Sequence, residues 1–391
     1  MQRGKPIYIS LTGDNSHKVN IPAGQGSFSI GTTGLSQGKY DVWVEEGAAI
    51  NWDAFNEFFT GHGRQNAKQH PYGDWPRFIY YSGNDRGFAG WSIKRKIEDF
   101  HWTPKEDTSI DLSKSNIYHF SLVAESSKIE VVIGDKIKQL TLSCNLENVD
   151  IKQCSAMPLL IFAPLLSQVE ARPYQLPVYN SLEKATYVDI KGLPVGQAFD
   201  CKSLLQFPNL TSLNLSGNMA NLETLAELKH LENIALRYVP DLTNMPKLAT
   251  WKNLKSFIGW NIEETAGKAL RAELNALSKK KELENYSSVS QLRKAIWFKT
   301  EYGIPFSAWE GKSEKVAVKA YKACLKEVRK SKTKAEVRKA IIEFIGIINT
   351  LPDIETTERE DVATAVCQLV ESSALGISEE TGINWFYETI N

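Results

Sequence analysis

Histidine and cysteine side chains are the groups in this 391-residue chain best suited to metal binding or covalent catalysis. His62 and His70 fall in a polar, glycine-rich run that ends beside Asp74. A metal site needs several ligands that converge at a fixed spacing, and two histidines well apart in one loop do not meet that need. We therefore expect no metal and no cofactor, and we interpret residues 61–74 as a surface loop.

The five cysteines are widely spaced and include no Cys-x-x-Cys pair: Cys144, Cys154, Cys201, Cys324 and Cys367. This pattern fits neither a disulfide framework nor a zinc finger, and it predicts free thiols in a reducing compartment. The sequence also contains no G-x-S-x-G nucleophile motif, no P-loop and no G-x-G-x-x-G after a strand. We predict a protein that is not an enzyme.

Charge and hydropathy limit the classes of partner that the chain is expected to bind. Lysine plus arginine and aspartate plus glutamate each number 46, so no net charge draws the chain to nucleic acid or to an anionic membrane. No apolar run follows the first residues, as a signal peptide would require. The longest apolar stretches, such as Met157 to Leu166, fall short of the roughly 20 residues of a membrane helix. We expect a cytoplasmic protein that binds neither nucleic acid nor membrane.

Residues 1–110 have the pattern of a mostly-β domain. Short aromatic and β-branched runs alternate with turn residues, which predicts strands at 8–11, 28–30, 40–44, 77–81 and 91–93. One helix is predicted where Trp52, Phe55, Phe58 and Phe59 recur at helical spacing. We expect the domain's aromatic residues to pack a core, with a carbohydrate-binding face as the alternative: Trp43, Trp52, Trp75, Tyr80, Tyr81, Trp91 and Trp102.

A repeated leucine pattern marks residues 111–265. Leu210 to Asn218 reads L-x-x-L-x-L-x-x-N, Leu231 to Leu236 repeats it, and Leu254 to Phe257 repeats its first half. Ile137 to Asn145 matches the full motif, and Ala185 to Ile190 fits as a strand. In its motif and in the spacing of its units, the region resembles the leucine-rich-repeat family. That resemblance implies an irregular solenoid whose units stack to bury their leucines, although no unit can be assigned between Leu146 and Pro177.

The residues between the inward leucines should form three rows on one face of stacked strands. An arginine beside a tryptophan is typical of protein-binding hot spots, and Tyr238 lies next to Arg237 in the sequence. We predict partner binding there; the alternative is that Trp260 and Tyr238 cover the junction with the following helices. The rows are Ser212, Asn233 and Ser256; Asn214, Ala235 and Ile258; and Ser216, Arg237 and Trp260.

Residues 266–391 are predicted to be a helical domain. Candidate helices cover 266–283, 290–298, 314–329, 334–348, 359–371 and 379–390, with a capping box at Thr333. Residues 312–339 hold eleven cations and three acids, whereas residues 353–388 hold nine acids and one arginine. We expect these blocks to complement each other within the domain; an acidic partner or a nucleic acid for the basic block is the alternative.

The chain is therefore predicted to be an α+β multidomain protein with a mostly-β domain, a leucine-rich-repeat solenoid and a helical domain. This architecture resembles bacterial leucine-rich-repeat proteins, some of which bind a cognate toxin or effector, including immunity proteins that block a toxin's active site. The resemblance implies a protein partner neutralised by steric occlusion. Bacterial ubiquitin-ligase effectors also join such repeats to helices, but their Cys-x-Asp motif is not matched at Cys324 or Cys367. An effector or enzyme with an N-terminal catalytic domain and a repeat targeting module is the alternative, and an adaptor for two proteins is a third.

Overall fold

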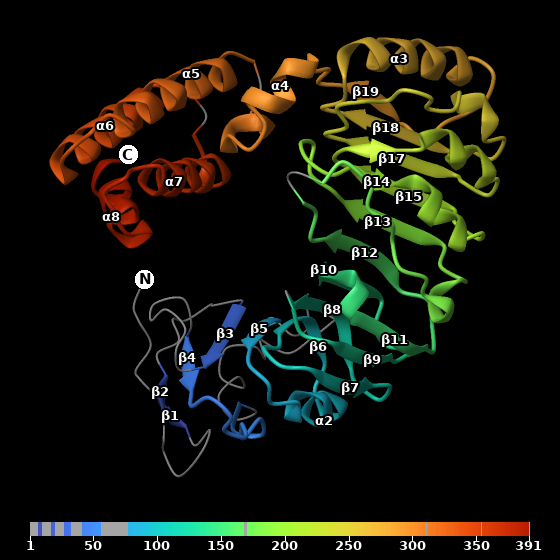
Figure 1. The fold of residues 1–391 in the computed structure, drawn as a ribbon, viewed down its shortest axis with the longest axis horizontal. Coiled ribbons are helices and arrows are strands. Elements are labelled where there is room, and N and C mark those ends of the chain that lie inside the picture. The colour runs from blue at the N-terminus through green and yellow to red at the C-terminus, as the bar shows by residue number, and fades with distance from the viewer. Residues whose placement is uncertain are drawn as a thin grey trace. The chain divides into compact units, whose positions relative to one another are not determined.

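The computed structural model describes residues 7–9, 17–19, 27–32, 41–55, 77–124, 126–167, 170–309, 311–352 and 354–390. The chain divides into two compact units, Met1–Ala295 and Ile296–Asn391. The first is mixed α/β and is dominated by one long parallel sheet, and the second is helical (Figure 1). The predicted order of a β-rich part followed by a helical region is confirmed at this level.

One sheet of twelve strands runs through the described part of the first unit. Its paired neighbours are all parallel. Parallel neighbours need a return connection after each strand, so the chain runs along the sheet and then back behind it. In spatial order the strands are β4 (Val42–Val44), β3 (Ser27–Thr32), β5 (Phe78–Ser82), β6 (Ile97–Thr103), β8 (Ile117–Ala124), β10 (Gln139–Cys144), β12 (Leu159–Pro164), β13 (Tyr187–Lys191), β15 (Ser212–Ser216), β17 (Asn233–Arg237), β18 (Ser256–Trp260) and β19 (Ser288–Ser290).

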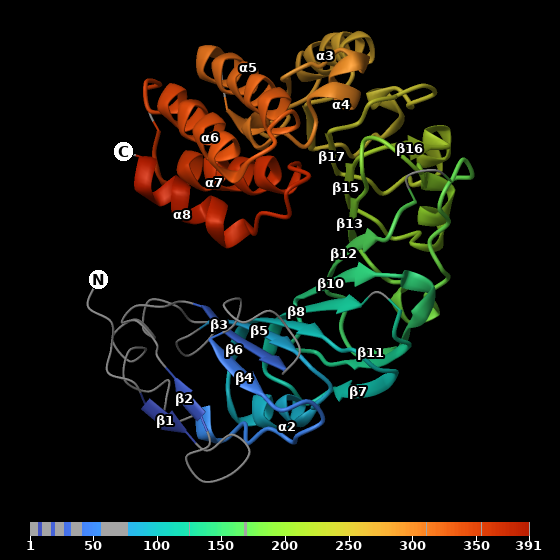
Figure 2. The ribbon, with the colours of Figure 1, turned by 60° about the vertical axis from the view of Figure 1, so that its left-hand side comes forward.

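The return segments carry short strands and 3-10 helices. Strands β7 (Thr108–Leu112), β11 (Val149–Cys154) and β16 (Met219–Ala220) lie on the return side of the main row of strands (Figure 2). A separate antiparallel pair, β1 (Ile7–Ile9) and β2 (His17–Val19), completes the described strands. The return elements are α2 (Gly87–Lys94), β7 (Thr108–Leu112), β9 (Ile129–Ile133), η1 (Leu146–Asn148), β11 (Val149–Cys154), η2 (Asn180–Leu182), β14 (Phe199–Asp200), η3 (Cys201–Gln206), β16 (Met219–Ala220), η4 (Leu222–Glu227), η5 (Leu248–Thr250) and α3 (Glu264–Ser278).

Neighbouring strands pair at similar intervals along the chain. We call the path of the chain from one strand of the sheet to the next a circuit. His119 pairs with Gln139, and Gln139 pairs in turn with Leu159, so these two circuits are equal in length. The next circuit is longer, because Leu160 meets its partner on β13 only at Val188. This longer circuit explains why no repeat unit could be assigned from sequence around β12: the leucine spacing that identifies a unit is interrupted there.

A continuous core fills the space between the sheet and the return segments, from Phe28 to Val289. Its N-terminal end is aromatic, with the rings of Phe88 and Phe100 stacked 4.3 Å apart. The predicted packing role is confirmed for Trp52, Tyr81, Trp91 and Trp102, which are buried. Tyr80 is 42% exposed, and the side chains of Trp43 and Trp75 lie outside the described residues.

Two predicted elements are wrong. Residues 91–93 were expected to be a strand but belong to α2, because Phe88 and Trp91, nearly one helical turn apart, both face the core while Ile93 is 46% exposed. The helix predicted from Ser290 begins later: Ser290 ends β19, and Gln291 has a φ of 50°, which no α-helix can continue. The helix there is α4 (Ala295–Thr300). The second half of the helix predicted from Trp52, and the whole 61–74 loop, lie outside the described residues.

The second unit contains η6 (Pro305–Ala308), α5 (Gly311–Val328), α6 (Lys334–Ile348), α7 (Thr356–Glu371) and α8 (Glu379–Thr389). These confirm the last four predicted helices, and the Thr333 capping box is formed with Glu336. The unit has its own core, from Ile304 to Phe386. No helix among the described residues combines the length and apolarity needed to cross a bilayer.

The compact units divide at residue 295, whereas the predicted domains divide at residues 110 and 265. Residue 110 lies within β7, and the core of the first unit continues across it. Residue 265 lies within α3, whose Leu270 and Leu274 belong to that same core. The finer division of the first unit stays a prediction.

Candidate functional site

The surface of the sheet that faces away from the core is formed by residues that alternate with buried leucines. Successive side chains of a strand point to opposite faces, and Leu213 and Leu215 are completely buried. The residues between them, and those in register on neighbouring strands, lie on the other face. We name this surface the ladder face, and it comprises Tyr187, Asp189, Lys191, Ser212, Asn214, Ser216, Asn233, Ala235, Arg237, Ser256, Ile258 and Trp260.

The register of β15, β17 and β18 confirms the three predicted rows. Ser212 pairs with Asn233 and Asn233 with Ser256; the Asn214 and Ser216 rows follow in the same register. The structure adds a fourth strand, β13, with Tyr187, Asp189 and Lys191 heading the rows. The strand at 185–190 was predicted, but its outward residues were not assigned to rows. The alternation of buried and outward side chains along this strand would have identified these three residues.

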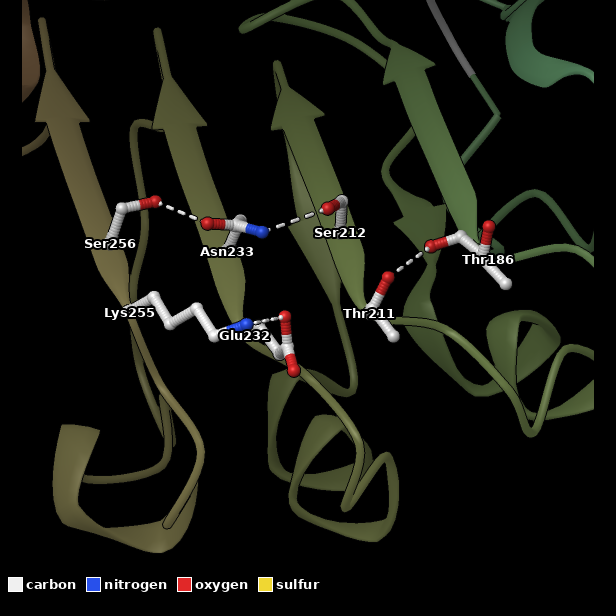
Figure 3. Close-up of polar contacts among 7 residues, drawn as sticks. All are labelled: Thr186, Thr211, Ser212, Glu232, Asn233, Lys255 and Ser256. Carbon is white, nitrogen blue, oxygen red and sulfur yellow. Dashed lines mark hydrogen bonds and ion pairs between the residues drawn. The ribbon is translucent and has the colours of Figure 1, made fainter. Parts of the chain in front are cut away.

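The first row is joined by hydrogen bonds between side chains. The Asn233 amide donates through Nδ2 to Ser212 Oγ at 3.1 Å and accepts from Ser256 Oγ at its Oδ1 at 2.8 Å (Figure 3). Ser256 is only 4% exposed. These groups satisfy one another, so the row aligns three strands and contributes little free hydrogen-bonding capacity to a ligand.

The second row contains a buried carboxylate and an amide, which bond to side chains of the other two rows. Asp189 is 5% exposed, and its Oδ2 lies 2.8 Å from the Lys191 ammonium. The Asn214 amide donates to the Tyr187 hydroxyl at 2.6 Å. Burial first, and then the charge of Asp189, raise the pKa of Tyr187, while Arg237 lowers it. The Tyr187 hydroxyl therefore keeps its proton at neutral pH.

The third row ends in an aromatic and cationic cluster. The Arg237 guanidinium lies 5.9 Å from the centre of the Trp260 ring, within the range of a cation–π contact. The Tyr238 ring meets Trp260 edge to face, with 5.0 Å between ring centres. All three side chains are partly exposed, whereas Ala235 in the second row is buried.

A residue with a left-handed backbone conformation directly follows several of the strands. Gly217, Tyr238, Asn261 and Gln291 have φ values of 98°, 53°, 52° and 50° directly after β15, β17, β18 and β19. A tyrosine rarely adopts this backbone conformation, and residues held in it often lie at functional sites. Here the conformation places the Tyr238 ring beside Trp260.

A second polar cluster lies on the same sheet at β5, β6 and β8. Asp99 Oδ1 is 2.9 Å from His101 Nε2, and Asp99 Oδ2 is 3.7 Å from His119 Nδ1. The half-exposed Tyr80 ring stacks on His101 with 4.4 Å between ring centres. The sequence does not predict this cluster, because the cluster depends on strand pairing in a region without a leucine motif.

The residues predicted for the catalytic alternative, His62, His70 and Asp74, lie outside the described residues. Across the described ranges, no three His, Cys, Asp or Glu side chains are placed to hold a metal ion. The five cysteines are free, and burial raises the pKa of Cys144 and Cys324 to about 12, which makes these thiols poor nucleophiles. A polar pocket of about 310 Å³ lies beside Thr32, Glu45, Asp85, Arg86 and Glu106.

Comparison with protein-family models, with curated proteins and with solved structures found no match to this chain.

Proposed function

We propose that β6 to β19 and their return segments form an irregular leucine-rich-repeat solenoid. Each circuit of the chain contributes one strand to the sheet, and most circuits have a length typical of leucine-rich repeats. The entry to each of β15 and β17 repeats one hydrogen-bond pattern. Two successive amides, those of Thr211 and Ser212, donate to the Thr186 carbonyl, and those of Glu232 and Asn233 donate to the Thr211 carbonyl.

On this scaffold we place a protein-binding site, and no catalytic site, on the ladder face. The observation that carries this proposal is the cluster of Arg237, Tyr238 and Trp260, which is partly exposed while its backbone is fixed by parallel strands. Arginine, tyrosine and tryptophan dominate binding hot spots, and a rigid backbone lowers the entropy lost on binding. Tyr187 and Lys191 extend the surface toward β13.

Within this proposal the partner is a cognate protein. The resemblance of the chain to bacterial leucine-rich-repeat proteins favours a toxin as that partner. Binding would then neutralise the toxin by steric occlusion, with the ladder face covering the toxin's active-site cleft. The chain would act as an immunity protein in the cytoplasm, where free thiols such as those of its five cysteines persist.

Co-expression tests this function. The full chain would be produced together with the product of the adjacent gene, and the two would be co-purified through a tag on this chain. We expect a stable one-to-one complex, and we expect this chain to protect cells from growth arrest caused by that product. Failure of both co-purification and protection would remove the proposed function.

A further inference from the structure

One face of α5 and of the turn that follows it carries positive charge without interruption. Its cations are separated mostly by steps of three and four positions, and each is exposed. At 3.6 residues per turn they fall within an arc of about 100° around the helix. We name this set the lysine row: Lys312, Lys315, Lys319, Lys322, Lys326, Arg329 and Lys330.

The lysine row lies opposite the face that α5 buries in the core of the second unit. The buried face includes Ala317, Tyr321, Cys324 and Val328. By the same helical geometry, Glu314 and Glu327 fall at the two borders between these faces, outside the arc of the row. Within the arc of the row, α5 therefore carries a single sign of charge.

The acidic block of α7 and α8 does not neutralise this row. Within the part of the chain that the structure describes, one ion pair joins the two blocks, and it involves α6: Arg338 and Glu388, at 2.8 Å. On the row itself, Lys322 pairs with Glu301 at 3.2 Å, and Lys330 lies 3.6 Å from Glu327. The predicted complement of the two blocks is thus seen at Arg338 and Glu388 and stays a prediction for α5.

Like charges on adjacent turns of one helix face destabilise the helix, and surfaces that serve only solubility usually mix both signs. The uninterrupted row thus weakens α5 in the isolated protein, and a partner of opposite sign would offset that cost. We propose that the lysine row is a docking surface for an acidic face of a partner protein. This inference does not depend on the ladder face.

The composition of the row favours protein over nucleic acid. Six of its seven cations are lysines, and no aromatic side chain lies within its arc. Nucleic-acid sites add base stacking on aromatic rings and bidentate arginine contacts to their charge contacts with phosphates, and the row offers one arginine and no aromatic ring for these. From Lys312 to Lys330 the row extends about 27 Å along α5 and the turn that follows it, which matches an acidic helix whose carboxylates recur at the same steps.

Fluorescence anisotropy with the full chain at physiological salt tests the proposal. The probe is a labelled helical peptide of about the length of α5, with glutamates at steps of three and four positions, compared with a scrambled peptide of equal charge. A short DNA duplex and phosphatidylserine vesicles complete the set. We expect the patterned peptide to bind at least ten-fold more tightly than the scrambled peptide and than either of the other probes.

The variant Lys319→Glu, Lys326→Glu should weaken binding of the patterned peptide at least ten-fold. Its melting temperature should be equal to or higher than that of the wild type, because the new glutamates face lysines on the adjacent turns of the helix. The matched control is Lys247→Glu, Lys252→Glu, two exposed lysines of the first unit, and it should leave binding unchanged.

Four results would overturn the assignment: tighter binding of DNA or vesicles that depends on the row, equal binding of both peptides, no binding of any probe, or salt-sensitive self-association that the Lys319→Glu, Lys326→Glu variant abolishes. The last would identify a second copy of the chain as the occupant.

Discussion

At the scale of single residues, the positions that follow the strands are the most constrained. Gly217 combines a φ of 98° with close packing, since a Cβ atom there would lie 2.3 Å from the carbonyl carbon of Gly192. Tyr238 occupies the equivalent position after β17 with a φ of 53°. A left-handed conformation costs an L-residue roughly 1–2 kcal/mol. The edge-to-face packing on Trp260 offsets part of that cost and fixes the Tyr238 ring on the surface.

Gly217→Ala should destabilise the first unit by about 2–4 kcal/mol, because the added methyl group meets backbone atoms that cannot move aside cheaply. Chemical denaturation of the full chain would measure the change. The control is Gly90→Ala, an exposed position within α2 where a Cβ meets nothing within 4 Å. It should stabilise the unit by up to about 1 kcal/mol. A Gly217→Ala variant as stable as the wild type would contradict the described strand exit.

At the scale of elements, the start of α6 is held by a charged cap. The Glu336 carboxylate accepts a hydrogen bond from the Lys332 amide at 2.7 Å and another from the Thr333 amide at 3.2 Å. The first of these bonds is the main reason why the pKa of Glu336 is lowered. A carboxyl group whose pKa is lowered in the folded state stabilises that state above its unfolded pKa, about 4.3, and loses the effect as the pH falls through the folded value.

Glu336→Gln should therefore lower the melting temperature of the second unit at pH 7, and the difference from wild type should shrink as the pH falls below about 4.3 and through the lowered folded pKa. Circular dichroism melts between pH 7 and pH 3 would follow it. Glu343→Gln removes the same charge from a site on α6 outside the cap and should leave the pH profile unchanged. A Glu336→Gln difference that stayed constant across this range would show that charge has no part in the cap.

Some of these elements could be predicted from the sequence, and others could not. Strands β15, β17 and β18, with their three rows, follow from the leucine motif because the motif fixes both the strand and the buried face. Helix α2 was missed because a run as short as 91–93 fits alternation as well as it fits a helix. The Asp99, His101 and His119 cluster was out of reach because side chains from two strands meet only through register. The charge blocks were visible, but only helical geometry shows that α5 presents its lysines on one arc.

At the scale of the whole molecule, the two hydrophobic cores share no residue. Leu213 is completely buried in the first core and Ile341 in the second. Truncation of such a side chain to alanine typically costs about 2–5 kcal/mol through lost burial and the cavity left behind.

Calorimetry of the full chain should accordingly resolve two transitions. Leu213→Ala should lower one of them and Ile341→Ala the other. Each variant serves as the control for the other, because the truncations are of similar size in different cores. A single transition that both substitutions lower by the same amount would contradict the division into two units.

The proposal that the ladder face binds a partner protein can be tested by the affinity of a Trp260 variant. Isothermal titration calorimetry would use the full chain and the adjacent gene product that co-purifies with it. We predict that Trp260→Ala raises Kd at least ten-fold, which corresponds to about 1.4 kcal/mol, because Trp260 is the largest partly exposed side chain of the cluster. Tyr387→Ala, which truncates a 72% exposed aromatic residue of the second unit, should leave Kd within two-fold. Equal affinities of Trp260→Ala and the wild type would contradict the claim.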